Sequence, residues 1–113
     1  MVHYMNLYDE KFEWVKAGRK VVEVRLYDEK RRKLQIGDII EFSKAPNMEE
    51  KVRAKVSGIQ VFDTFEDLFY AIPKEQMGYQ EITLDDFLGL AYSIYTVENE
   101  KKYGAVGIRV KLL

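Results

Sequence analysis

The sequence contains no cysteine and only one histidine. These absences exclude disulfides, thiolate nucleophiles, sulfur-ligated metals and histidine-rich metal sites, and we expect neither a bound metal nor another cofactor. No stretch approaches the roughly 18 to 20 consecutive apolar residues that a membrane helix needs, and the N-terminus lacks the segments of a signal peptide. A glycine-rich phosphate loop and a Ser-His-acid arrangement are absent too, which disfavours nucleotide hydrolysis and triad chemistry. We therefore expect a cytoplasmic protein without a membrane partner.

Charge is nearly balanced over the 113 residues, with a formal net charge of -1, but it is unevenly distributed. Residues 16–33 contain eight lysines and arginines against three acids, whereas residues 63–100 contain nine acids against one lysine. The basic segment predicts either a patch that meets phosphate groups or a solvated turn, and both alternatives stay open. The acidic segment leaves only the other face of the molecule for a long RNA.

The spacing of apolar residues predicts five strands and three helices. We expect strands over residues 2–7, 21–26, 39–42, 52–62 and 104–112, and helices over residues 9–16, 65–71 and 84–95. The predicted helix caps are Asp9, Thr64 and Thr83, the predicted end of the first helix is Gly18, and the predicted β-bulge is at Gly58.

The connections between these elements indicate how the sheet is built. A Gly-Asp turn before residue 39 is typical of a hairpin or meander between the second and third strands. Alternation in the last strand predicts one buried face. Short connections favour antiparallel pairing, and a small sheet gains by curling into a barrel that hides its edges. We predict that residues 1–113 form a single α+β domain.

A charged motif stands at the start of the second strand, where Lys20, Glu23 and Arg25 follow Gly18. Side chains alternate across a strand, so Glu23 and Arg25 share one face with Val21, while Val22, Val24 and Leu26 take the other. The strand is therefore expected to have one apolar and one charged face.

Three motifs follow one another along nearly the whole chain. They are Gly18, Lys20, Glu23 and Arg25, then Gly37–Phe42, and finally Glu100–Ile108. In this order they resemble the ASCH domain, a branch of the PUA-like barrel superfamily. The resemblance implies a PUA-like, mixed but mostly antiparallel β-barrel of five to six strands with about three helices. It also implies a cleft beside the Lys-x-x-Glu-x-Arg strand that handles RNA or a modified nucleoside.

The leading hypothesis from this resemblance is a binding cleft. Lys20 and Arg25 engage phosphate, and Glu23 accepts hydrogen bonds from a base or a sugar hydroxyl. Tyr103, at the mouth of the last strand, is the preferred stacking residue, and Arg109 completes the predicted ligand-binding set. The other aromatic candidates are Tyr95, Tyr27 and Trp14, of which Trp14 fits the core better.

A second hypothesis is an enzyme, because one branch of the family hydrolyses N4-acetylcytidine with a lysine, a threonine three residues later and a further glutamate. Lys20 matches that lysine, Glu23 occupies the threonine position, and Glu81 falls approximately at the later glutamate. In this interpretation Glu23 or Glu81 activates water, Lys20 polarises the carbonyl, and Arg25 holds a carboxylate or phosphate.

Two structural alternatives remain open at this point. Glu23 and Arg25 could form an ion pair without function, with Lys20 exposed in the preceding turn. The chain could also be a protein-interaction module with unknown partners, which a surface without a cleft at Lys20 would favour. His3 is expected to be a hydrogen-bonded structural residue.

Overall fold

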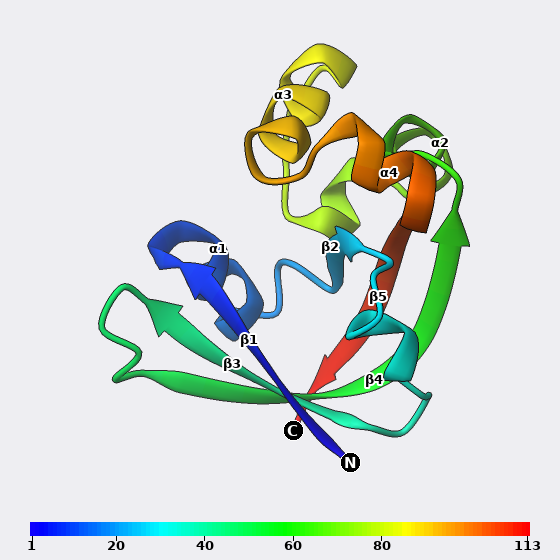
Figure 1. Ribbon diagram of the computed structural model, residues 1–113. Helices are drawn as coiled ribbons and strands as arrows, with labels where there is room; N and C mark the ends of the chain where they lie inside the picture. The colour runs from blue at the N-terminus through cyan, green and yellow to red at the C-terminus, as the bar shows by residue number, and fades with distance from the viewer.

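A computed structural model describes residues 1–113 (Figure 1). Its single sheet is built from β1 (Val2–Tyr8), β2 (Val22–Leu26), β3 (Ile39–Ala45), β4 (Lys51–Phe62) and β5 (Ala105–Leu112). The strand order is β1-β3-β4-β5-β2. β1 pairs with β3 in parallel, and every other pairing is antiparallel. The sheet curls into an open half-barrel, and the predicted α+β class with a mixed, mostly antiparallel sheet of five strands is confirmed.

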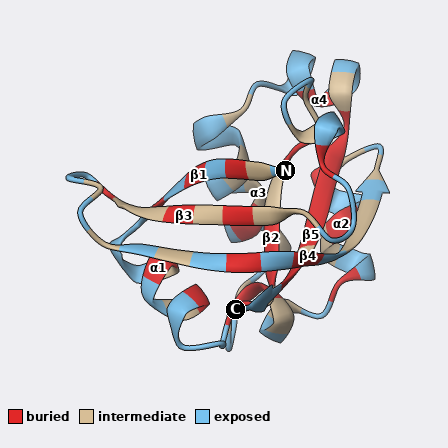
Figure 2. Cartoon of the chain, turned by 90° about the horizontal axis from the view of Figure 1, so that it is seen from below, coloured by how far each residue is buried: buried red, intermediate tan, exposed pale blue.

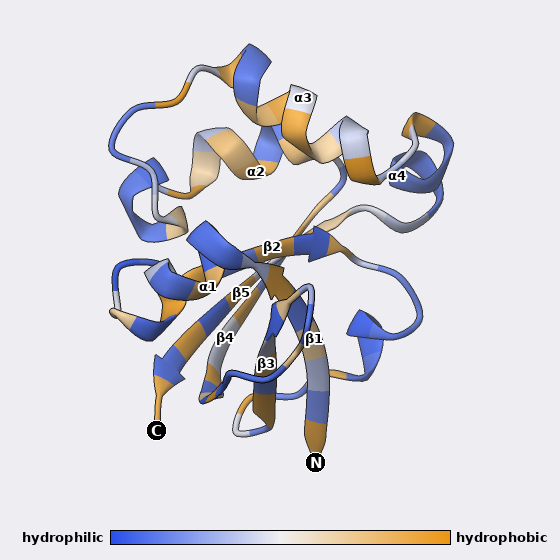
Figure 3. Ribbon diagram, turned by 90° about the vertical axis from the view of Figure 1, so that its left-hand side faces the viewer, coloured by the Kyte–Doolittle hydropathy of each residue, from blue (hydrophilic) through white to orange (hydrophobic).

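Four helices accompany the sheet. They are α1 (Asp9–Lys16), α2 (Phe65–Ala71), α3 (Leu84–Ile94) and α4 (Val97–Tyr103), with short 3-10 turns at η1 (Arg31–Lys33) and η2 (Lys74–Met77). Figure 3 shows α2, α3 and α4 as a layer on one side of β2, with the rest of the sheet on the other. None of the helices has the length and apolar character that crossing a membrane requires.

Two cores meet at the strand β5, which contributes residues to both. The first lies inside the curl of the sheet and includes Phe12, Phe42 and Ile108. The second lies between β2, β5 and the helical layer and includes Val22 and Leu68. Consequently β5 is buried on both faces from Ala105 to Ile108 (Figure 2). The expectation of a single buried face for this strand is wrong, because helices cover the side that the alternation pattern assigned to solvent.

The predicted hairpin between the second and third strands is also wrong. β2 pairs with β5 at one edge of the sheet, whereas β3 lies between β1 and β4. The charged segment 27–38 carries the chain from the β2 edge past β5 and β4 to β3 and forms η1 on the way. A local turn signal could not reveal this crossing, because strand partners are chosen by long-range packing.

Most of the predicted helix caps and chain irregularities are confirmed. The hydroxyl oxygens of Thr64 and Thr83 accept hydrogen bonds from the backbone N–H groups three residues later, at 3.0 and 3.1 Å. Gly18 ends α1 with a φ of 76°, and the register of β4 shifts between Val56 and Gly58 as predicted. Asp9 is not a cap, since the α1 cap position is Tyr8 and Asp9 lies in the first turn.

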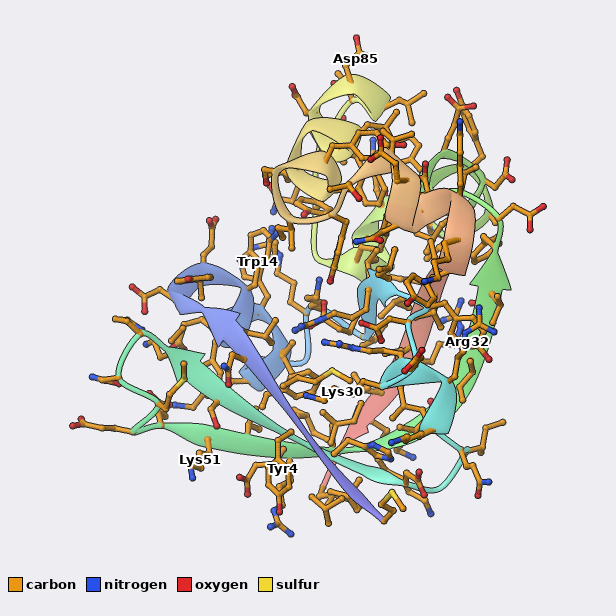
Figure 4. The ribbon with its side chains drawn as sticks, in the orientation of Figure 1. Tyr4, Trp14, Lys30, Arg32, Lys51 and Asp85 are labelled. Atoms are coloured by element: carbon orange, nitrogen blue, oxygen red, sulfur yellow. The ribbon has the colours of Figure 1, made fainter.

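Side chains bridge the open seam between the edge strands β1 and β2. The Arg25 guanidinium donates a hydrogen bond of 2.9 Å from Nη2 to the Asn6 carbonyl, and the Lys30 ammonium donates one of 3.0 Å to the Tyr4 carbonyl. Lys30 lies between β1 and η1 in Figure 4. Long basic side chains therefore satisfy carbonyls of β1 that a neighbouring strand would otherwise pair.

His3 on β1 is buried, and its Nε2 lies 2.8 Å from Asp38 Oδ2. The expected structural role of this histidine is thus confirmed. The same aspartate accepts a hydrogen bond from the Gln35 N–H, so it stabilises the turn before β3.

Candidate functional site

The Lys-x-x-Glu-x-Arg motif begins where α1 ends. Gly18 turns the chain away from the helix, and the N–H groups of residues 19 and 20 donate to the Trp14 carbonyl. β2 follows, with Val22 and Leu26 in the core beneath the helical layer. Glu23 and Arg25 are the register partners of Ile108 and Val106 on the neighbouring strand β5. They lie on the face of β2 opposite to Val22 and Leu26. The predicted division into an apolar and a charged face is confirmed.

The three charged groups converge on Glu23. Lys20 Nζ lies 3.5 Å from Glu23 Oε1, and Arg25 Nη2 lies 3.5 Å from Glu23 Oε2. Lys20 and Glu23 are each only 4% exposed. The alternative in which Lys20 stands exposed in a turn is therefore wrong, because the ammonium reaches inward and donates a hydrogen bond of 3.4 Å to the Met77 carbonyl.

The carboxylate of Glu23 has few hydrogen bonds for so buried a group. Oε1 accepts one from the Val24 N–H at 3.0 Å, whereas Oε2 accepts none. Burial raises the pKa of Glu23, but the charges of Lys20 and Arg25 and the Val24 N–H together outweigh it, so that the pKa lies below its usual value. The group is an ionised carboxylate with an oxygen still available to a donor.

A narrow cleft opens at this carboxylate. It lies along β2, between α1 and α3, and has a cavity volume of about 60 Å³. Its polar lining comes from Lys11, Lys20, Glu23 and Tyr79, and its apolar lining comes from Val24, Phe65, Phe87, Leu90, Ala91, Ile94 and Tyr95. The cleft thus combines one cluster of charge with apolar and aromatic walls, a composition typical of small-molecule sites.

Tyr79 forms one wall of the cleft and is held by Trp14, whose ring meets it edge to face at a centroid distance of 5.4 Å. Burial raises the pKa of Tyr79, so its phenol stays neutral beside Glu23. Gly78 before it has a φ of 99°, and a Cβ there would lie 2.6 Å from the Trp14 ring and 3.3 Å from Lys20 Cβ. Glycine therefore allows Trp14 and Lys20 to pack closely at this point.

The structure brings only part of the sequence-predicted set together. Lys20, Glu23 and Tyr95 line the cleft, and Arg25 adjoins it through Glu23. The remaining predicted residues lie elsewhere. Glu81 is exposed and pairs with Lys74 at 3.0 Å, Arg109 donates to the Gln60 side chain at 3.1 Å, and Tyr103 lines a separate groove with Tyr27.

Sequence reasoning missed Lys11, Tyr79 and the apolar wall from α3. Lys11 belongs to a helix whose register alone does not indicate contact with β2. Tyr79 follows a short 3-10 turn that has no periodic signal. No cluster of three or more histidine, aspartate or glutamate side chains in the structure could hold a metal ion.

The family model of the ASCH domain matches residues 5–113. The chain belongs to the ASCH domain family. Two solved structures are similar to this ASCH domain over its full length. The hypothetical protein PH0355 has 34% identity, a TM-score of 0.88 and full coverage of both chains. Protein PF0455 from Pyrococcus furiosus has 32% identity and a TM-score of 0.74, with 98% of its own chain covered.

More distant ASCH structures share the fold. A serine-to-alanine mutant of ZmASCH from Zymomonas mobilis has 11% identity and a TM-score of 0.67, and the match covers 97% of this chain and 67% of that one. The ASCH domain from Lactobacillus crispatus has 11% identity and a TM-score of 0.64, with 97% and 79% covered. At this identity the likeness concerns the fold alone. No curated protein matches this ASCH domain.

Proposed function

We propose that this ASCH domain binds RNA or a modified nucleoside by holding one base in the cleft at Glu23. The observation that carries the proposal is the buried Oε2 of Glu23, an ionised oxygen that accepts no hydrogen bond. An unsatisfied buried acceptor costs roughly 1–3 kcal/mol, and more when it is charged. A ligand that donates to this oxygen recovers that free energy.

The chemistry of the cleft selects the kind of base. A carboxylate accepts hydrogen bonds only, so it favours bases with an exocyclic amine, such as cytosine or guanine. Lys20 donates only, so it complements a base carbonyl. Tyr79 and Tyr95 supply aromatic surface for the flat faces of the base, which is a common mode of single-nucleotide recognition.

The cleft must widen to admit a base, since about 60 Å³ accommodates only a few water molecules. We expect α3 to be the element that moves, because few of its residues are buried. Of its residues only Phe87 is fully buried, while the cleft-lining Leu90 and Ile94 are 42% and 70% exposed. Displacing these two side chains costs little buried apolar area, and a base would bury them in return.

Titration of the four ribonucleosides by calorimetry or NMR tests the proposal. We expect cytidine or guanosine to bind more tightly than uridine, and Glu23→Gln to weaken that binding roughly 10- to 100-fold, as for a charged hydrogen bond. Glu81→Gln is the matched control, because it removes the same charge from a residue that is 89% exposed and outside the cleft. Equal affinities for the two variants, or no binding of any nucleoside, would overturn the proposal.

A second candidate function is hydrolysis of an N4-acetylcytidine-like amide. It is favoured by the buried approach of Lys20 Nζ to the Glu23 carboxylate at 3.5 Å. Glu23 would take a proton from water as the water adds to the acetyl carbonyl, and Lys20 would stabilise the resulting oxyanion. Cleavage of the C–N bond, with the proton returned to the leaving amine, gives acetate and cytidine. The lowered pKa makes Glu23 a weak base, so binding ranks first.

Incubation with N4-acetylcytidine, followed by chromatography of released acetate, tests the second candidate. Turnover that is lost in Lys20→Ala and Glu23→Gln but retained in Glu81→Gln would support it and assign Glu81 no part. No turnover by the native protein would exclude it and would leave the binding proposal to the nucleoside titrations. A surface without a cleft at Lys20 would have favoured the protein-interaction hypothesis, and this surface has one.

A further inference from the structure

A second groove lies beyond the other end of β2, between η1, the end of β4 and the end of α4. Its volume, about 500 Å³, far exceeds that of the cleft at Glu23. The residues that give it its character are Tyr27, Arg32, Asp63, Lys101, Lys102 and Tyr103. Arg32 lies beside the ends of α4 and β4 in Figure 4. The groove is therefore wide, whereas the cleft at Glu23 is narrow.

Cations dominate this groove. Arg32, Lys101 and Lys102 form no ion pair, and the single acid of the lining is Asp63. This positive surface contrasts with the net charge of -1 for the whole molecule and with the strongly acidic segment 63–100. Because like charges repel, three unpaired cations close together favour an anionic ligand.

Two of the cations are held against aromatic rings. The Arg32 guanidinium lies 4.5 Å from the centre of the Tyr27 ring and donates from Nε and Nη2 to the carbonyls of Tyr27 and Tyr103, at 2.9 and 3.0 Å. Lys102 Nζ lies 5.1 Å from the centre of the Tyr103 ring. Nη1 of Arg32 remains without a partner. Fixed cations beside half-buried aromatic rings match the alternation of phosphate and base in a single strand of nucleic acid.

The groove and the cleft adjoin each other along the chain. Val24 lines the cleft and Tyr27 lines the groove, three residues apart, which corresponds to about 10 Å along a strand. Thr64 and Phe65 likewise line the groove and the cleft as sequence neighbours. A separation of this size is spanned by one or two nucleotides.

From these contacts we infer that the groove binds the phosphodiester backbone of a single-stranded RNA whose base occupies the cleft. The inference rests on the proposed function and deepens it, because it makes the ligand a nucleotide within a strand rather than a free nucleoside. The aromatic residues Tyr27 and Tyr103 then contact the neighbouring bases, and the lysines contact phosphates.

Fluorescence anisotropy with 5′-fluorescein-labelled hexacytidylate RNA at several salt concentrations tests this inference. The variant Lys101→Ala/Lys102→Ala removes two exposed groove charges. We expect it to bind the RNA at least about tenfold more weakly and to lower the slope of log affinity against log salt by about 1.4, or about 0.7 per phosphate contact. Cytidine binding should not change, because neither lysine lines the cleft.

The matched control is Lys55→Ala/Lys111→Ala, which removes two exposed lysines that face each other on β4 and β5, outside the groove. Circular dichroism and melting temperature confirm that both variants are folded. If the two double variants bound the RNA equally well, the groove would not bind the RNA backbone, and the proposal of base binding in the cleft would be unaffected. The same conclusion would follow if the native protein bound the RNA no more tightly than it binds cytidine. Cytidine binding insensitive to Glu23→Gln would instead overturn the proposed function, and the inference with it.

Discussion

Glu23 has three positively charged side chains nearby but accepts only one hydrogen bond. Lys20, Arg25 and Lys11 all lower its pKa, yet its two ion pairs measure 3.5 Å. Charge-assisted hydrogen bonds between such groups measure about 2.7–2.9 Å. The cations therefore keep the carboxylate ionised without saturating it. Oε2 therefore keeps its capacity to accept a hydrogen bond, which a tight ion pair would use up, and the binding proposal relies on that capacity.

Removing Lys20 should destabilise the protein, because the buried carboxylate of Glu23 then loses one of its two ion-pair partners. Lys20→Met keeps an unbranched side chain that is one atom shorter and uncharged. We expect it to lower the free energy of unfolding by about 3 kcal/mol, the lower end of the range for breaking a buried pair, because Arg25 remains. Adding Glu23→Gln removes the charge left behind, so the double variant should regain at least about 1 kcal/mol over the single variant. Urea denaturation measures both.

Lys51→Met is the control for the hydrophobic substitution itself, since Lys51 is an exposed residue whose only ion pair is a long one to Glu41. We expect a change within about 0.5 kcal/mol. A double variant less stable than Lys20→Met would contradict electrostatic coupling between Lys20 and Glu23 and would make Glu23 a hydrogen-bonding residue alone.

Elements with strong periodicity or a clear cap could be predicted from the sequence, and α4 could not. Its only buried residue is Glu100, and Val97 is half exposed, so no apolar stripe marks the helix. The one signal was Thr96, whose hydroxyl accepts from the Asn99 N–H at 3.1 Å. The parallel pairing of β1 with β3 was equally inaccessible, because sequence patterns give the faces of a strand but not its neighbours.

A single carboxylate ties the three helices of the layer together. Glu100 on α4 accepts hydrogen bonds from the Tyr92 hydroxyl on α3, at 2.8 and 3.0 Å, and from the Phe65 N–H at the start of α2, at 2.8 Å. Burial and the neighbouring Glu100 raise the pKa of Tyr92 to about 12. The position of α3, and with it one wall of the cleft, depends on this link.

Tyr92→Phe should destabilise the protein by about 1–2 kcal/mol at pH 7, because Glu100 loses a donor while remaining buried. The difference from the native protein should shrink as the pH rises from about 10 to about 12. In that interval an unfolded tyrosine with a pKa near 10 gives up its proton, whereas folded Tyr92 keeps it, so the native protein loses the stability that the hydroxyl provides. Urea denaturation at pH 7, 10 and 11.5 measures the trend. A constant or growing difference would contradict the assigned hydrogen bond.

Over the whole molecule, the site depends on long-range folding far more than on the motif. The lining of the cleft comes from α1, β2 and the turn before it, the start of α2, the loop after η2 and the helix α3 with its C-cap, which together range from Lys11 to Tyr95. Lys20, Glu23 and Arg25 could be predicted because a turn and a strand place them within six residues. Tyr79 and Lys11 could not, because only the packing of the helical layer on β2 brings them to Glu23.

The two cores should unfold together, because β5 contributes one face to each of them. Val106 and Ile108 pack inside the sheet, while Ala105 belongs to the core beneath the helices. The helical layer therefore cannot detach without uncovering β5, which also contributes to the other core. We expect Leu68→Ala, which opens a cavity in the helical core, to cost about 2–5 kcal/mol as a property of the whole molecule.

Two probes of urea denaturation can test that coupling. Trp14, the only tryptophan, reports on α1 and the cleft through its contact with Tyr79, while far-UV circular dichroism reports on all elements. The two transitions should coincide in the native protein and shift by the same amount in Leu68→Ala, without a change in slope. If circular dichroism changed at lower urea than the tryptophan fluorescence, the helices would be a separately unfolding layer. The cleft wall formed by α3 would then be able to open without disturbing the half-barrel beneath it.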